Sequence, residues 1–169
     1  MRPLVHGLHL GLLQTGLLLA LQRATSAAAE TYAAVLGGWL LGAASGLWLG
    51  AAPRALVLLG VVAHLVAHLA LAGVDFSARS PALWLPAIIA VGLYSGRYFT
   101  AAIAAGEAPA RVFAGETYGF LVGAVLALVA AVVGGRWALV LAPVISAAPV
   151  LALGPASPPD RRGPKPNVP

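Results

Sequence analysis

The sequence lacks cysteine and has few charged residues, and each shortage excludes a class of protein. With no cysteine among 169 residues, a disulfide, a thiolate zinc site and an iron–sulfur cluster held by thiolates are all excluded. Charged residues make up 9% of the chain, hydrophobic residues make up 60%, and the mean hydropathy is +0.92. A water-soluble domain of this length could not bury so much apolar surface, whereas bilayer hydrocarbon accepts it. We therefore expect an integral membrane protein.

The sequence also lacks the signatures of soluble catalytic sites. It has no phosphate-binding loop, no dinucleotide fingerprint and no nucleophile elbow. The connections between apolar blocks are short and poor in polar residues, so they leave little room for an aqueous active site. The net charge of +5 comes from basic residues scattered at block ends, which is not the pattern of a nucleic-acid groove. We expect a protein that is not an enzyme and does not bind nucleic acid.

What the chain does have is six apolar blocks, each close to the roughly 20 residues that a membrane span needs. The blocks cover residues 4–22, 31–51, 54–74, 81–105, 111–134 and 137–154. Alanine, leucine and glycine dominate them without strict alternation, which favours helices over a barrel. Short connections favour antiparallel neighbours. The pattern predicts an all-α, six-helix antiparallel transmembrane bundle over residues 1–154, and a disordered, proline-rich basic tail over 155–169.

The distribution of Lys and Arg predicts the orientation of this bundle. If the N-terminus is cytoplasmic, seven basic residues fall inside and three outside, which favours a multi-pass protein of the cell (inner or plasma) membrane with both termini cytoplasmic. The inner set is Arg2, Arg54, Arg97, Arg111, Arg161, Arg162 and Lys165, and the outer set is Arg23, Arg79 and Arg136. As an alternative, the first block resembles a cleavable signal peptide with small residues at 27–29. Cleavage there would leave five spans and reverse the N-terminal side.

Glycines recur every four residues in three of the blocks. Such stripes let helix backbones approach closely, and this packing drives helix association in lipid. The stripes are Gly38, Gly42, Gly46 and Gly50 in the second block, Gly92 and Gly96 in the fourth, and Gly119 and Gly123 in the fifth. They predict tight packing within the chain; a homodimer face or a sliding surface in a transporter are the alternatives.

Two charged residues flank the turn expected at residues 106–109. Arg97 lies nine residues before Gly106 and Glu116 lies ten after it, so a helical hairpin places both at nearly the same depth, about 14 Å from the turn. Charges at that depth usually pair or line a polar cavity. We expect an intramembrane Arg97–Glu116 ion pair; a longer loop that leaves both charges at the surface is the alternative.

Four histidines fall within expected spans. His6 and His9 are three residues apart in the first block, and His64 and His68 are four apart on one face of the third. Imidazoles in a membrane suggest haem b, a metal or a proton relay. One ligand from the first span and one from the third could hold a haem. No carboxylate lies nearby in sequence to complete a metal site, so neutral hydrogen-bonded histidines are the simpler interpretation, and we predict no cofactor.

Several stretches resemble membrane-embedded spermidine synthase-like proteins. The run ARVFAGETYGFLVG, which starts at Ala110, is similar to the family pattern GRVYAxDxxGxxxGxL. The matching positions are Arg111, Val112, Phe113, Ala114, Glu116, Gly119 and Gly123. Gly96, Arg97 and Phe99 resemble the family segment GxxFPLA, with Thr100 in place of its proline. The glycine run with Trp39 is similar to that family's second helix.

The resemblance implies a helical membrane domain that normally precedes a soluble aminopropyltransferase-like domain. Only 15 residues follow the last expected span, so we expect no aminopropyl transfer by this chain. The resemblance implies a non-catalytic membrane protein that anchors or serves a separate soluble aminopropyltransferase-like partner or a membrane partner subunit. Two alternatives stay open: a transporter of a polyamine-like small solute, and a membrane electron-transfer subunit with haem b between the first and third helices.

Overall fold

The structure is a computed structural model that describes residues 1–24, 29–49, 53–72 and 81–153. All regular secondary structure in these ranges is α-helical, which confirms the expected helical class. The helices are α1 Arg2–Ala24, α2 Ala29–Trp48, α3 Pro53–Ala72, α4 Pro81–Ala104 and α5 Pro109–Leu153. The tail predicted to be disordered, Gly50 of the glycine stripe and Arg79 lie outside the described residues.

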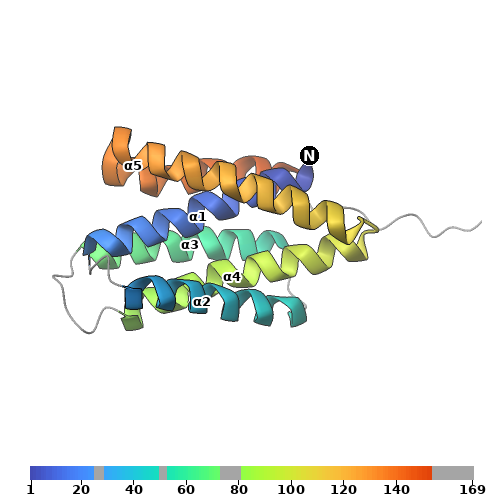
Figure 1. Ribbon diagram of the computed structural model, residues 1–169, viewed down its shortest axis with the longest axis horizontal. Helices are drawn as coiled ribbons and strands as arrows, with labels where there is room; N and C mark the ends of the chain where they lie inside the picture. The colour runs from blue at the N-terminus through green and yellow to red at the C-terminus, as the bar shows by residue number, and fades with distance from the viewer. Residues whose placement is uncertain (25–28, 50–52, 73–80, 154–169) are drawn as a thin grey trace, which may run out of the picture.

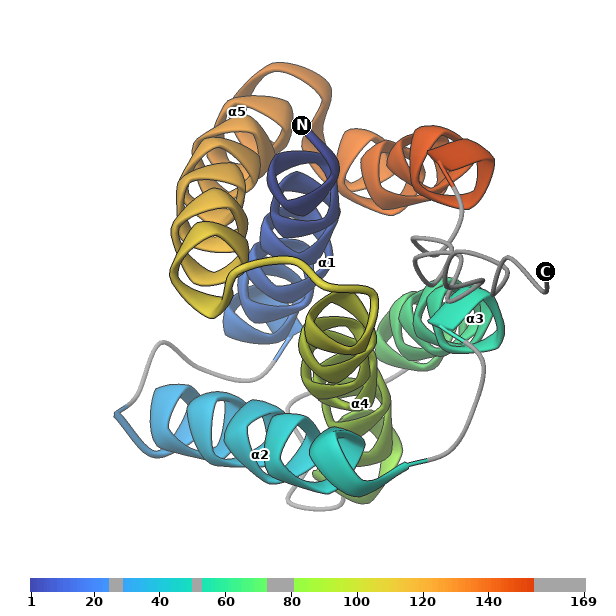
Figure 2. The ribbon, with the colours of Figure 1, turned by 90° about the vertical axis from the view of Figure 1, so that its right-hand side faces the viewer.

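Helices α1 to α4 match the first four expected spans to within three residues at each end, but α5 covers two expected spans. Its 45 residues are broken at Gly135, where φ is 58° and ψ is −145°. This backbone conformation is essentially restricted to glycine. Two helical halves therefore meet at Gly135, and Figure 2 shows them turning back on each other to flank α1.

The length of α5 requires this reversal. A straight helix of 45 residues would measure about 68 Å, and α1 with 23 residues measures about 35 Å. Yet both halves of α5 lie against α1: Gly119 of the first half is next to Leu4, and the Leu139 carbonyl of the second half is next to Gly16. The chain consequently runs back and forth along one axis, as Figure 1 shows.

Helix α1 packs closely against the first half of α5, where glycines of both helices interlock. A methyl group on Gly7 or Gly11 of α1 would overlap the carbonyl oxygens of Glu116 and Phe120. Methyl groups on Gly119 and Gly123 would likewise overlap the carbonyl oxygens of Leu4 and Leu8 on α1. Backbones this close also permit Cα–H···O contacts, so each glycine fixes the register of the pair.

Helices α2 and α4 pack through a second glycine interlock. Gly42 and Gly46 of α2 lie against the Ile89 and Leu93 carbonyls of α4, while Gly92 and Gly96 of α4 lie against the Trp39 and Ala43 carbonyls of α2. Gly38 instead meets the side chains of Leu85 and Ile88. These contacts are all within one chain. Helix α3 completes this side of the bundle by packing on α4.

The outer surface of the bundle carries many large apolar side chains. Side chains that are more than half exposed include Leu41 of α2, Leu69 of α3, and Leu121, Val132 and Ile145 of α5, with Val132 86% exposed. By length and composition, four described helices could cross a membrane: α1, α3, α4 and α5. Helix α2 is not among these four, because its glycines, its serine and Glu30 lower its hydropathy. Soluble proteins rarely expose large contiguous apolar patches.

Candidate functional site

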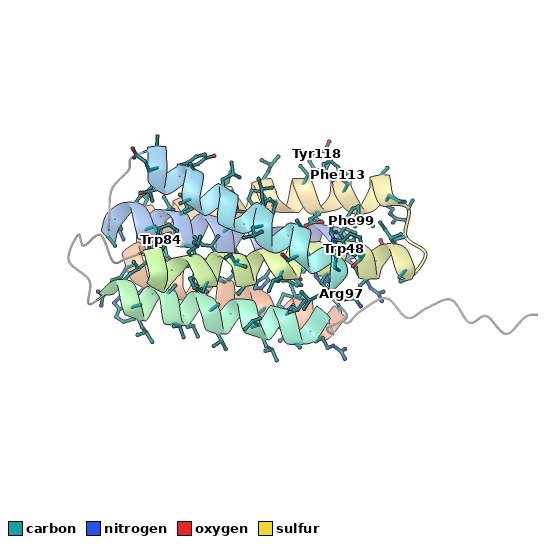
Figure 3. The ribbon with its side chains drawn as sticks, turned by 90° about the horizontal axis from the view of Figure 1, so that it is seen from below. Trp48, Trp84, Arg97, Phe99, Phe113 and Tyr118 are labelled. Carbon is teal, nitrogen blue, oxygen red and sulfur yellow. The ribbon has the colours of Figure 1, made fainter. Side chains whose placement is uncertain are left out.

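A groove of about 730 Å³ lies between α1, α2, α4 and the first half of α5. Its volume is within the range of small-molecule sites. Residues of α1 and α4 also line it, and α2 and α5 form its two sides; Figure 2 shows these four helices around one region of the bundle. The lining is mostly apolar, with aromatic rings contributed by Trp39, Phe99, Phe113 and Phe120. Figure 3 shows Phe99 and Phe113 toward the same end of the bundle.

Glu116 is the acidic side chain in this lining. The hydroxyl of Ser95 on α4 donates a hydrogen bond of 2.9 Å to Glu116 Oε1. Glu116 lies seven residues after the start of α5, about 10 Å along the helix from the α4–α5 turn. This hydrogen bond holds the Glu116 side chain at the wall of the groove.

Arg97 does not line the groove, although Glu116 does. Arg97 Nη1 donates to Thr100 Oγ1 at 3.3 Å, and that hydroxyl donates to the Arg97 carbonyl at 3.0 Å. Arg97 and Glu116 thus form these hydrogen bonds with different partners, Thr100 and Ser95. The ion pair between Arg97 and Glu116 stays a prediction.

Two further polar groups that line the groove have no hydrogen-bond partner. The Oε1 atom of Gln14 on α1 and the Nε1 atom of Trp39 on α2 are both buried and unpartnered. Buried polar atoms are satisfied in the large majority of cases, so an unsatisfied pair in one groove calls for an explanation. Both atoms are shielded from the open space of the groove, whose lining also includes the hydroxyl side chains of Thr15, Tyr32 and Thr117.

The four histidines lie outside this groove lining: His6, His9 and His64 are buried in the core, and His68 is half-buried. His6 bonds through Nδ1 to the Tyr94 hydroxyl and stacks on Tyr98 with ring centroids 3.8 Å apart. His9 Nδ1 lies 2.7 Å from Ser146 Oγ. Because that serine donates to the Pro143 carbonyl, its oxygen accepts from the histidine.

On α3, His64 Nε2 donates to the Leu139 carbonyl at 3.1 Å, and the His64 and His68 rings are 4.4 Å apart. A hydrogen bond from His64 therefore joins α3 to the second half of α5, and a hydrogen bond from His9 joins α1 to the same half. The His64 ring lies at the level of Gly16, seven residues beyond His9, so His9 and His64 are offset by about 10 Å along α1. That offset gives no support to axial ligation of one haem by this pair, and haem b stays an untested alternative. Across the described ranges, no three His, Asp or Glu side chains are grouped to hold a metal.

The sequence carries signals for several of these residues. Gly7 and Gly11 have the same four-residue spacing as the stripes in the other helices, and Gln14 is a polar residue inside an apolar block. Ser95 carries no such signal, because only the rotation of α4 brings it to the groove. No protein family model, no curated protein and no solved structure matches the chain.

Proposed function

We propose that the chain crosses the membrane six times, with α1 to α4 and the two halves of α5 as the spans. The exposed apolar side chains on the outer faces support this, since they match a hydrocarbon environment. So does α5, whose length is about twice the roughly 30 Å of bilayer hydrocarbon and which reverses at Gly135. Glycine interlocks are also the packing that lipid-embedded helices use in place of a hydrophobic driving force.

In this arrangement both described ends of the chain lie on the cytoplasmic side. Met1, Arg2, Glu107 and Arg111 line one small pocket, so the N-terminus and the α4–α5 turn share an end of the bundle. Arg54 begins α3 at that end, whereas Arg23 ends α1 and Arg136 follows the break in α5 at the other. The excess of arginine at the first end supports its cytoplasmic placement.

The function that the groove supports best is binding and movement of a small organic cation. The observation that carries this proposal is Glu116, a carboxylate held by Ser95 in a groove whose other lining is largely apolar. Carboxylates within membrane helices usually serve a ligand or ion pathway. This proposal corresponds to the alternative that the sequence left open, a transporter of a polyamine-like small solute. The expectation that the chain anchors or serves a soluble partner protein stays a prediction. The apolar outer faces do not single out a docking site for such a partner.

Replacing Glu116 by glutamine tests the proposal. The amide keeps the size of the side chain and removes its charge. Loss of a charged hydrogen bond is worth about 1.5–3 kcal/mol, so amine binding is expected to weaken by about tenfold or more. Equilibrium binding of radiolabelled spermidine and of the long-chain amine 2-aminododecan-1-ol to protein in nanodiscs measures this, and proteoliposome uptake measures movement.

The matched control is Glu107→Gln, which removes the same charge at the α4–α5 turn outside the groove. Glu107→Gln should bind and transport like the natural protein. If neither amine distinguishes Glu116→Gln from the natural protein, the groove does not recognise cations and the proposed function fails.

A further inference from the structure

The groove is open sideways, toward the surroundings of the bundle. Among the described residues no Cα atom of α2 lies within 8 Å of a Cα atom of α5, although both helices line the groove. Side chains on its two sides are correspondingly exposed: Tyr32 and Leu40 of α2 are 55% and 51% exposed, and Phe113 of α5 is 66% exposed. In a membrane-spanning chain this opening faces lipid acyl chains, because the helices beside it present apolar surface.

The charge in the groove is matched to a single ammonium group. Among the described residues that line the groove, Glu116 is the acid, and none is a lysine, arginine or histidine. A polyamine with two or three ammonium groups would leave at least one charge without a counter-charge in a site of low dielectric. Uncompensated charge there is costly. The lining therefore favours one positive charge on an otherwise apolar molecule.

Glu116 and the apolar wall beside it define the ligand. An ammonium group has N–H donors, and the side-chain oxygens of Glu116 can accept from them. Leu36, Leu40 and Leu47 extend the apolar wall along α2, over about 16 Å of helix from Leu36 to Leu47, which suits an alkyl chain.

We propose that the groove binds a single-chain amphipathic amine, and that this ligand enters from the bilayer between α2 and α5. The inference rests on the proposed function and narrows it to a substrate class and a route. The amine contacts Glu116, and the alkyl chain lies along α2.

The first experiment compares two probes, 2-aminododecan-1-ol and spermidine, on protein in nanodiscs. Empty nanodiscs and Glu116→Gln nanodiscs supply the background of amine dissolved in lipid. The natural protein should bind 2-aminododecan-1-ol about tenfold or more tightly than Glu116→Gln does, and should show no Glu116-dependent binding of spermidine.

The second experiment tests the route with a pair of neighbouring residues. Leu40 lines the groove, and Leu41 is similarly exposed on α2 but does not line it. Leu40→Trp should slow the association of 2-aminododecan-1-ol several-fold by narrowing the opening, and Leu41→Trp should leave the rate unchanged. Both variants add the same indole to a lipid-facing helix, so a general effect on folding would appear in both.

The outcomes separate this inference from the proposed function. Glu116-dependent binding of spermidine without binding of the amino alcohol would keep the function and overturn the substrate class. Equal association rates for Leu40→Trp, Leu41→Trp and the natural protein would overturn the lateral route. A cysteine at Leu40 that cross-links two copies, with no amine bound, would assign the groove to a second copy of the chain and overturn the inference altogether.

Discussion

Leucine in place of Gly119 is expected to prevent the bundle from forming. Even a methyl group at this position would overlap the Leu4 carbonyl oxygen of α1, and the nearest atoms are all backbone, which cannot swing aside. The two helices would have to separate along the interlock that also contains Gly7 and Gly11. Overpacking typically costs about 1–3 kcal/mol where side chains can adjust, and the cost here should exceed that range. Recovery of monodisperse protein after detergent extraction measures the effect.

The matched control is Gly37→Leu on α2. Gly37 is exposed, and a methyl group there would meet nothing within 4 Å. Leucine forms helices better than glycine by somewhat under 1 kcal/mol, so helix propensity alone predicts that both variants gain stability. A loss of stability for Gly119→Leu together with a gain for Gly37→Leu would support the glycine interlock. Equal recovery of the two variants would mean that α1 and α5 are not packed through these glycines.

Valine in place of Gly135 is the second change with a large expected effect. A φ of 58° with ψ of −145° is nearly inaccessible to a β-branched residue, and strain of this kind costs about 1–3 kcal/mol. If the backbone relaxes instead, the second half of α5 swings away and loses the His64–Leu139 and His9–Ser146 contacts. Thermal unfolding in detergent should shift to clearly lower temperature than for the natural protein.

Gly37→Val is the control, since valine replaces glycine in an open helical position there. Similar unfolding temperatures for Gly135→Val and Gly37→Val would show that the left-handed conformation at Gly135 is not required. The reversal by which α5 covers two expected spans would then not depend on the glycine at position 135.

Sequence spacing predicted depth in the bundle better than it predicted rotation about a helix. Counting outward from the turn at 106–109 placed Arg97 and Glu116 at one level, and Glu116 does reach across to α4 at about that level. There it accepts a hydrogen bond from Ser95, which is two residues from Arg97 and therefore about 200° around α4. A count of residues fixes height along a helix, whereas the side that faces a neighbour depends on packing that the count does not contain.

The glycine stripes show the same limit. Their four-residue spacing predicted close contact, and the structure places Gly42 and Gly46 against α4, and Gly119 and Gly123 against α1. The identity of each partner helix was not predictable, because nothing in a local repeat specifies which distant segment faces it. The histidines are similar: their partners Tyr94, Leu139 and Ser146 lie at least 75 residues away in sequence.

Single-cysteine labelling tests the central claim, six crossings with reversal at Gly135, most directly. The chain has no cysteine, so each introduced cysteine is the sole reactive thiol. Glu107→Cys, in the α4–α5 turn, should react with a membrane-impermeant maleimide from the cytoplasmic side alone. Arg136→Cys, next to the reversal, should react from the opposite side alone. Labelling of both positions from the same side would contradict the account, because the first half of α5 would then not cross the membrane.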